Sequence, residues 1–265
     1  MAFPLYVVDA FTDEAFRGNP AGVVIGDGPA PWMQRVAAEM KHSETAFVRT
    51  RPDGAYNLRW FTPEVEVDLC GHATLAAAHV LFSTGRVPAA DTVAFHTRGG
   101  ELRASATRTG DITLDFPVAE PVPEPANPAL FRALGITPSG FLRTDGDFFM
   151  CVVDDASTVR DCNPDLHAMR ALDGVRGVYV TAADDDPRHD IVSRCFAPRV
   201  GIDEDPVTGS MHCVLVAYWG SRLGRDELRA FQASPRGGEM TVLRKGSRAL
   251  LTGSATTVLE GQLLV

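Results

Sequence analysis

The sequence lacks a surplus of positive charge. Its 25 Lys and Arg residues are outnumbered by 34 Asp and Glu residues, which gives a formal net charge of −9 over 265 residues. Nucleic acids and anionic membranes are bound chiefly by basic surfaces. We therefore expect neither as a partner, while a local positive pocket for a small anion stays compatible with this composition.

Long apolar runs and paired cysteines are also missing. No stretch approaches the roughly 20 apolar residues of a membrane-spanning helix, and the first residues lack a basic region followed by an apolar one. The five cysteines are scattered, with no CxxC pair and no zinc-like spacing (Cys70, Cys151, Cys162, Cys195 and Cys213). Free thiols are typical of a reducing compartment, so the sequence predicts a cytoplasmic protein.

The sequence does contain an internal repeat. The pattern R-x-F-x-P-x-x-x-x-D begins at Arg59 and again at Arg194, an offset of 135 (194 minus 59). Arg-Gly-Gly-Glu begins at Arg98 and again at Arg236, an offset of 138 (236 minus 98). Matches in the same order at nearly one offset indicate a duplicated unit. The proline-rich segment 116–125 suits a linker, so we predict half-domains at 1–118 and 119–265, with a C-terminal strand free to return to the first.

Short β-patterned segments dominate the first half. They are rich in Val, Phe and Thr and are separated by Gly, Pro and Asp; they comprise residues 5–11, 21–25, 45–49, 56–61, 93–97, 102–107 and 112–116. Met33, Val36, Ala37 and Met40 have the spacing of one amphipathic helix. The second half repeats this pattern, with a helix expected around 164–172.

Two stretches, 72–82 and 210–219, are apolar on nearly every helical face. A helix without a polar face must be enclosed on all sides, and in a strand-rich domain a curved sheet is the simplest enclosure. We therefore predict an α+β fold with two pseudo-symmetric β-barrel-like half-domains, each wrapped around a buried central helix. Both helices begin in Gly-containing turns, where unpaired N–H groups form a ready anion site. If both starts face one cleft, they would hold a small carboxylate.

Five motifs resemble one family, the phenazine-biosynthesis (PhzF-like) isomerases. They occur at 8–12, 18–23, 43–47, 69–74 and 204–210, so that the resemblance spans essentially the whole chain. It implies the diaminopimelate-epimerase fold, with an active site between two barrels. It also implies that no cofactor or metal is needed, and that the chain is a homodimer.

The resemblance further implies roles for individual residues. Glu44 is similar to the family's general acid/base, and His72 and Asp205 match its catalytic polar residues. The implied substrate-binding residues are Asn19, Gly71, Gly209 and Ser210. The chemistry requires a carboxylate whose pKa is raised by burial, so that it can take and return a proton near neutral pH. Without the resemblance, Glu44 would be interpreted as a solvated loop charge.

Plainer interpretations stay open for the other residues. His72 and Ser210 are also suitable as ordinary helix-start residues, and Asp205 lies in an acidic stretch that is typical of a solvated turn. His79 and His212 are expected to be core histidines. His72 and His79 are seven apart, but the sequence shows no third ligand, so no metal site is predicted.

Cys70 separates two enzymatic hypotheses. Racemases of the implied fold use two opposed cysteines, one at each helix start, but residues 207–209 contain none. Cys70 is therefore expected to be a small packed residue. The leading prediction is a cofactor-independent isomerase in which Glu44 moves a proton on a small carboxylate-bearing substrate. The alternatives are a Cys70-based amino-acid racemase or epimerase, and a non-catalytic small-molecule-binding protein of the same fold. No residue identifies the substrate.

Overall fold

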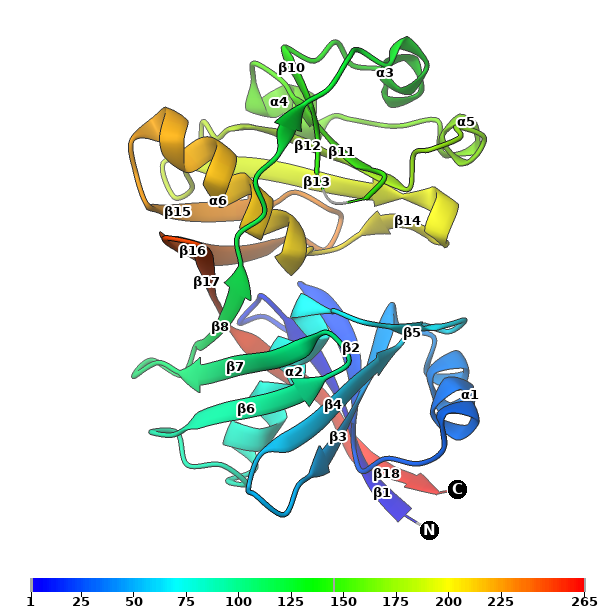
Figure 1. Ribbon diagram of the computed structural model, residues 1–265, viewed down its shortest axis with the longest axis vertical. Coiled ribbons are helices and arrows are strands. Elements are labelled where there is room, and N and C mark those ends of the chain that lie inside the picture. Colours follow the sequence, from blue (N-terminus) through cyan, green and yellow to red (C-terminus); the bar gives the residue numbers. More distant parts are fainter. Residues whose placement is uncertain (1, 145, 265) are drawn as a thin grey trace. The chain divides into compact units, whose positions relative to one another are not determined.

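We describe a computed structural model of the chain, which places residues 2–144 and 146–264 (Figure 1). The chain forms two compact units. The first comprises Met1–Phe116 together with Leu250–Val265, and the second comprises Pro117–Ala249. The last strand therefore belongs to the same unit as the first strand, and the chain leaves the first unit within the proline-rich segment.

The first unit is built mainly from strands. They are β1 (Ala2–Ala10), β2 (Asn19–Ile25), β3 (Glu44–Thr50), β4 (Tyr56–Phe61), β5 (Glu66–Val67), β6 (Thr92–Thr97), β7 (Gly100–Ala106), β8 (Ile112–Pro117) and β18 (Ala255–Leu264), with helices α1 (Ala30–Met40) and α2 (Gly71–Ser83). They pair in the order β18–β1–β2–β3–β4–β6–β7–β8, with β5 on β4. The β2–β3 and β4–β6 pairs are parallel, and the others are antiparallel.

Helix α2 is enclosed by this sheet. It contacts β1, β2, β3, β7 and β18 (Figure 1), and all its residues except His79, Phe82 and Ser83 are buried. The sequence explains this fit, because the small alanines of α2 let strands approach on several sides. The amphipathic helix α1 instead packs one face, formed by Met33, Val36 and Ala37, against Phe47 and Phe61. The predictions of one buried and one amphipathic helix are confirmed.

The second unit has the same kinds of element. Its strands are β9 (Val122–Pro123), β10 (Gly140–Arg143), β11 (Phe148–Val152), β12 (Gly177–Ala183), β13 (Ile191–Ala197), β14 (Ile202–Asp205), β15 (Glu227–Gln232), β16 (Gly238–Lys245) and β17 (Arg248–Gly253), and its helices are α3 (Pro128–Leu134), α4 (Ala156–Arg160), α5 (Leu166–Arg170), the 3-10 turn η1 (Pro198–Val200) and α6 (Gly209–Leu223). Helix α6 is buried from Met211 to Gly220 and contacts β15 and β16. Strand β17 continues into the first unit, where it pairs with β8.

Strand pairing repeats between the units. The order β9–β10–β11–β12–β13–β15–β16, with β14 on β13, matches β18–β1–β2–β3–β4–β6–β7, with β5 on β4. The parallel pairs β11–β12 and β13–β15 correspond to β2–β3 and β4–β6. The repeat in the sequence therefore corresponds to a repeated order of strand pairing. The chain has a mixed α/β fold with extensive sheet and few helices, and no helix of the described residues is long and apolar enough to cross a membrane.

In each copy of the R-x-F pattern, the arginine binds a glutamate on the segment that leads to the buried helix. We call this arginine–glutamate pair a clamp. Arg59 donates from Nε and Nη2 to Glu66, both at 2.7 Å. Arg194 donates in the same two-pronged way to Glu204, at 2.7 and 2.8 Å. Each guanidinium also lies over the phenylalanine two residues later, at 5.1 and 4.8 Å from the ring centres. The clamps tie β5 to β4 and β14 to β13, and so fix the segment just before each helix.

Removing the second clamp tests its contribution to stability. Arg194 and Glu204 have side chains only 11% and 16% exposed, so Arg194→Met leaves a largely desolvated carboxylate without its cation. We expect the free energy of unfolding in urea to fall by about 3 kcal/mol. The matched control Arg103→Met removes the exposed pair with Glu101 and should cost less than about 1 kcal/mol. Equal losses of unfolding free energy in the two variants would contradict a larger contribution from the Arg194–Glu204 pair.

Candidate functional site

The start of strand β2, the start of β3 and the start of α2 meet in the first unit. Gly18 turns the chain into β2 with φ +62°, and a Cβ there would lie 2.2 Å from the carbonyl oxygen of Ala10, so the turn requires glycine. Ala21 of β2 pairs with Glu44 of β3 in parallel register. Asn19 and Glu44 therefore lie at the same end of two neighbouring strands. Helix α2, which packs on both strands, brings His72 to that end.

Glu44 and His72 form a pair that is largely shielded from water. His72 Nε2 lies 3.3 Å from Glu44 Oε2, and the side chains are 5% and 12% exposed. Asn19, predicted as a substrate-binding residue, is fully buried, and its Nδ2 lies 3.1 Å from His72 Nδ1. The Ser43 hydroxyl donates to Asn19 Oδ1 at 3.3 Å. Asn19 is thus placed behind the imidazole and supports it.

This chain of hydrogen bonds selects one form of His72. With Oδ1 of Asn19 accepting from Ser43, its amide N–H group faces His72 Nδ1 and donates to it. A neutral imidazole whose Nδ1 accepts must carry its hydrogen on Nε2. That hydrogen points at Glu44, so the Nε2–H group of the imidazole faces a Glu44 carboxyl oxygen 3.3 Å away.

Burial keeps His72 uncharged. It lowers the pKa of His72 to about 3, and the nearby His42 opposes protonation further. At neutral pH His72 is therefore a neutral group beside Glu44, and the two do not form an ion pair. Such an arrangement leaves Glu44 able to act as a base while His72 stabilises negative charge without exchanging a proton itself.

Cys70 completes the cluster. Its Sγ lies 3.6 Å from His72 Nδ1 and 4.0 Å from Nε2, and the residue is 7% exposed. One ligand-type atom from each of Glu44, Cys70 and His72 lies within 4.8 Å of the others. The prediction of a packed cysteine is confirmed for burial, and the structure also places the thiol beside His72 and Glu44.

The second helix start carries Asp205, Gly209 and Ser210 in the second unit. Asp205 Oδ2 accepts from Thr208 Oγ1 at 2.6 Å, and Gln232, which is fully buried, donates to the Asp205 carbonyl at 2.7 Å and accepts from Thr208 N at 2.7 Å. Asp205 is half-buried, Gly209 is buried and Ser210 is exposed. The predicted residues are thus held in place by two that the prediction omitted, Thr208 and Gln232.

Both helices begin without a side-chain cap. Cys70 precedes α2 and Thr208 precedes α6, and neither side chain accepts from a first-turn N–H group. Uncapped first-turn N–H groups with the positive end of the helix dipole favour an anion. Each unit therefore has one helix start suited to an anion, and carboxylate binding there stays a prediction.

His212 and His79, which were expected to be core histidines, contact neighbouring groups of the fold. His212 is fully buried, its Nδ1 lies 2.8 Å from the Thr208 carbonyl within α6, and burial lowers its pKa to about 4. His79 is only partly buried, and its Nε2 lies 3.0 Å from Thr257 Oγ1. Neither lies in the described group of Glu44, Cys70 and His72.

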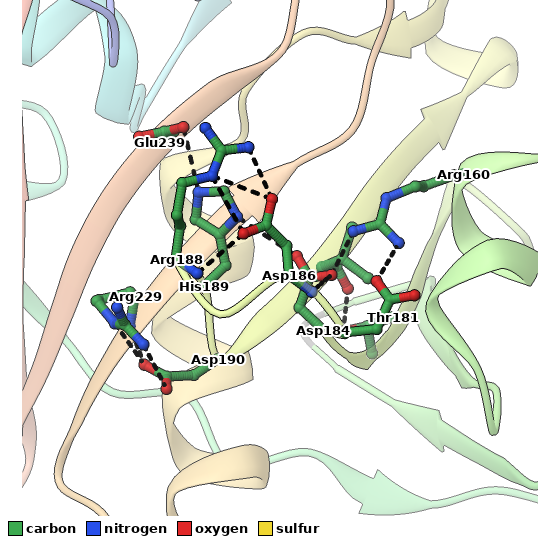
Figure 2. A network of polar contacts seen from close by, with 11 residues as sticks. Arg160, Thr181, Asp184, Asp186, Arg188, His189, Asp190, Arg229 and Glu239 are labelled. Atoms are coloured by element: carbon green, nitrogen blue, oxygen red, sulfur yellow. Dashed lines mark hydrogen bonds and ion pairs between the residues drawn. The ribbon is translucent and has the colours of Figure 1, made fainter.

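A separate polar network in the second unit joins β12 to β13 (Figure 2). The Asp184 side chain is fully buried between Arg160 and His189, whose Nδ1 is 3.5 Å away. Arg188 hydrogen-bonds Asp186 and holds the pKa of that carboxyl well below its usual range. Asp190 accepts from the backbone and side chain of Arg229. Because each carboxylate faces a basic side chain, we interpret this network as holding the loop of residues 184–190 in place.

Comparison with known proteins identifies relatives over the full length. A family model described as phenazine biosynthesis-like protein matches residues 8–261. An uncharacterized isomerase of Halalkalibacterium halodurans is 45% identical over 269 residues, covering 100% of each chain. The crystal structure of a phenazine biosynthesis protein of the PhzF family from Enterococcus faecalis is 42% identical, has a TM-score of 0.93 and covers 100% of each chain.

A more distant structure shares the fold. A predicted epimerase from Pseudomonas aeruginosa superposes with a TM-score of 0.78 at 21% identity, covering 99% of each chain. At that identity the likeness is one of fold. The mixed α/β architecture is therefore common to proteins named as isomerases and as epimerases.

Acid should weaken the fold through its buried histidines. The pKa of His212 is lowered from 6.5 to about 4, so below pH 6.5 the unfolded chain binds a proton that the folded chain does not. Stability is therefore fully present above pH 6.5 and is lost as the pH falls towards 4. Between pH 7 and pH 5 we expect His212 to contribute a loss of roughly 2 kcal/mol.

The measurement is urea unfolding of wild type and His212→Leu at several pH values. The variant should lose about 2 kcal/mol less than wild type between pH 7 and pH 5, whatever its stability at pH 7. The exposed His167 of the same unit provides the control His167→Asn, which should follow the wild-type slope. Parallel slopes for all three proteins would contradict the burial argument.

Proposed function

The chain belongs to the phenazine biosynthesis-like protein family, and we propose that it is an isomerase in which Glu44 moves a proton on a small carboxylate-bearing molecule. The observation that carries this proposal is the shielded Glu44–His72 pair, with 3.3 Å between Oε2 and Nε2 at an uncapped helix start. This site combines a base, a neutral donor and a place for an anion within one unit.

Substrate binding would use the helix starts. A carboxylate is proposed to dock on the first N–H groups of α2 around Gly71, and the matching start of α6 at Gly209 and Ser210 is proposed to bind the same molecule. Asp205 would then accept a hydrogen bond from an amino or hydroxyl group of the substrate. This part of the proposal requires two barrel-like half-domains with both helix starts facing one cleft, as the sequence predicts.

Proton transfer would start from ionised Glu44. The carboxylate removes the proton from a carbon adjacent to the substrate carboxylate, or conjugated with it, and the electron pair of the broken C–H bond moves into an enolate-like system. Helix N–H donors and the Nε2–H group of His72 stabilise this charge. Electrostatic stabilisation of this type often dominates the barrier. Protonated Glu44 then returns the proton to another carbon or to the other face, so the reaction is redox-neutral and consumes no co-reactant.

The geometry favours Glu44 over the rival hypotheses. A Cys70 racemase needs a second acid on the opposite face, and the equivalent position before α6 is Thr208, whose hydroxyl donates to Asp205. A purely binding protein has no need to bury a carboxylate against an imidazole, since burial of a charge costs free energy unless a function or a partner offsets it.

Deuterium uptake tests the general-base assignment. The protein is incubated in D2O with a panel of small amino, hydroxy and keto acids, and the mass of each acid is followed. We expect wild type to catalyse exchange in at least one acid, and Glu44→Gln to lower that rate by at least about 100-fold. The matched control Glu14→Gln, at an exposed residue of the same unit, should keep the wild-type rate. Unchanged exchange in Glu44→Gln would exclude Glu44 as the base.

Replacing the thiol separates the two enzymatic hypotheses. Cys70→Ser keeps the size of the side chain and should retain at least about one tenth of the wild-type exchange rate, because the thiol transfers no proton in the proposed mechanism. A Cys70-based racemase would instead lose about 100-fold or more. The readout is the same exchange assay, with the folded state of the variant checked by circular dichroism.

A further inference from the structure

We propose that a pocket on the first unit binds the phosphate group of a small phosphorylated molecule. The pocket has a volume of about 360 Å³, and its lining comes mainly from strands β3, β4 and β6, which are neighbours in the sheet (Figure 1). The lining includes Asp27, Arg49, Asn57, Arg59, His96 and Arg98. The inference does not rest on the proposed function.

The pocket lies away from the candidate active site. Glu44 begins β3, and Arg49 is five residues further along the same strand (49 minus 44), which corresponds to about 16 Å at about 3.3 Å per residue. Successive side chains of a strand point to opposite faces, so Glu44 and Arg49 also lie on opposite faces of the sheet. The pocket is therefore a separate site from the one proposed for proton transfer.

The internal repeat shows which contact the first unit leaves open. Both clamp arginines bind their glutamate through Nε and Nη2. Nη1 of Arg194 also donates to the carbonyl oxygens of Arg160 and Cys162, at 3.1 and 2.6 Å. In the first unit, no described residue accepts from Nη1 of Arg59, and this side chain is 31% exposed where that of Arg194 is 11% exposed. Arg59 thus lines the pocket with a donor that its counterpart uses within the fold.

Arg98 brings a second guanidinium close to Arg59. Its Nη1 lies 3.1 Å from Glu66 Oε2, and Arg59 Nη2 lies 2.7 Å from the same oxygen, so the two nitrogens are at most 5.8 Å apart (2.7 plus 3.1). Two cations therefore share one carboxylate, and the three groups together carry a charge of +1. The Nε of Arg98 also contacts Asp68 at 3.1 Å, but Asp68 is exposed and water screens its charge.

The rest of the lining adds a third cation and neutral donors. Arg49 is exposed and lies 3.3 Å from Asp27. Asn57 accepts from Arg51 through Oδ1 at 3.1 Å, so its remaining polar group is the Nδ2 donor. The half-buried His96 ring has no hydrogen bond to any residue that the structure describes. Three arginines and one carboxylate thus line a pocket of a protein whose net charge is −9.

These donors select an anion with several oxygen atoms. Guanidinium groups form strong charge-assisted hydrogen bonds with carboxylate and phosphate oxygens. Here the donors come from β3, from β4 and from the turn after β6. A tetrahedral phosphate can offer an oxygen to each, whereas a planar carboxylate has only two oxygens. The volume is near the lower end of the roughly 300–1,000 Å³ typical of small-molecule sites, so an organic group also fits beside the phosphate.

Calorimetry of the full chain with inorganic phosphate, at constant ionic strength set by sodium chloride, tests the site. We expect one phosphate per chain, and at least about tenfold weaker binding of acetate. Arg49→Met and Arg98→Met should each weaken phosphate binding at least about tenfold, because each removes a charged donor. The matched control Arg103→Met should bind phosphate as wild type does. Arg103 is 64% exposed, close to the 57% of Arg49 and Arg98, and lies outside the pocket.

Nitrogen-15 NMR of the arginine Nε–H groups locates the bound phosphate in the wild-type chain, which keeps the test decisive if a variant does not fold. The signals of Arg49, Arg59 and Arg98 should shift together and saturate at one phosphate concentration. The signal of Arg194 should not shift, because its Nη1 is already hydrogen-bonded. Glycerol 3-phosphate should bind at least as tightly as inorganic phosphate and shift the same signals.

Three outcomes would contradict the proposal. Equal phosphate affinity in Arg49→Met, Arg98→Met and Arg103→Met, or arginine signals that follow ionic strength alone, would overturn the site. Acetate bound as tightly as phosphate would overturn the choice of phosphate. A pocket that binds inorganic phosphate and excludes glycerol 3-phosphate would overturn the phosphorylated molecule as its ligand.

Discussion

The hydrogen bond between Glu44 and the buried imidazole of His72 is the interaction on which the site depends. A carboxylate removed from water needs donors in place of the lost hydration, and His72 provides one. The imidazole in turn needs a partner on its other nitrogen, which is Asn19, held by Ser43. Each of these four side chains therefore requires the next one. The starts of β2 and β3 and the first turn of α2 bring them together.

The two units share their order of strand pairing but carry different side chains at the start of the buried helix. Both units have the same strand pairings, an arginine clamp ahead of a buried helix, and an uncapped helix start. The first start carries Cys70 and His72 and faces Glu44, whereas the second carries Thr208 and Ser210 beside Asp205. Both helix starts therefore lack a side-chain cap, while the side chains around them differ.

Local sequence patterns predict a large part of this fold. The all-apolar stretches at 72–82 and 210–219 predict buried helices because an unpatterned helix must be enclosed, and both are buried. The R-x-F repeat indicates a duplicated structural feature, but the carboxylates that complete the clamps are Glu66 and Glu204. The aspartates that end the repeated pattern, Asp68 and Asp203, contact Arg98 and Arg170 instead. Partner choice depends on register, which one strand alone does not reveal.

The long-range contacts of the site are the part that the sequence could not supply. The family resemblance implies that Asn19 binds the substrate; the structure adds its contact with His72, which is 53 residues away along the chain. Gln232 has no motif around it, and its role at Thr208 appears only when β15 lies beside the helix start. Likewise Cys70 and Glu44 are 26 positions apart (70 minus 44), and their proximity follows from the packing of α2 on β3.

The proposed chemistry depends on a neutral His72 that directs its Nε2–H group at Glu44. Nitrogen-15 chemical shifts of the His72 ring in the ligand-free, metal-free protein measure this directly, with the signals assigned by comparison with His72→Gln. We expect a neutral ring with hydrogen on Nε2 and none on Nδ1 from pH 8 down to about pH 5. An imidazolium at neutral pH, or a hydrogen on Nδ1, would contradict it.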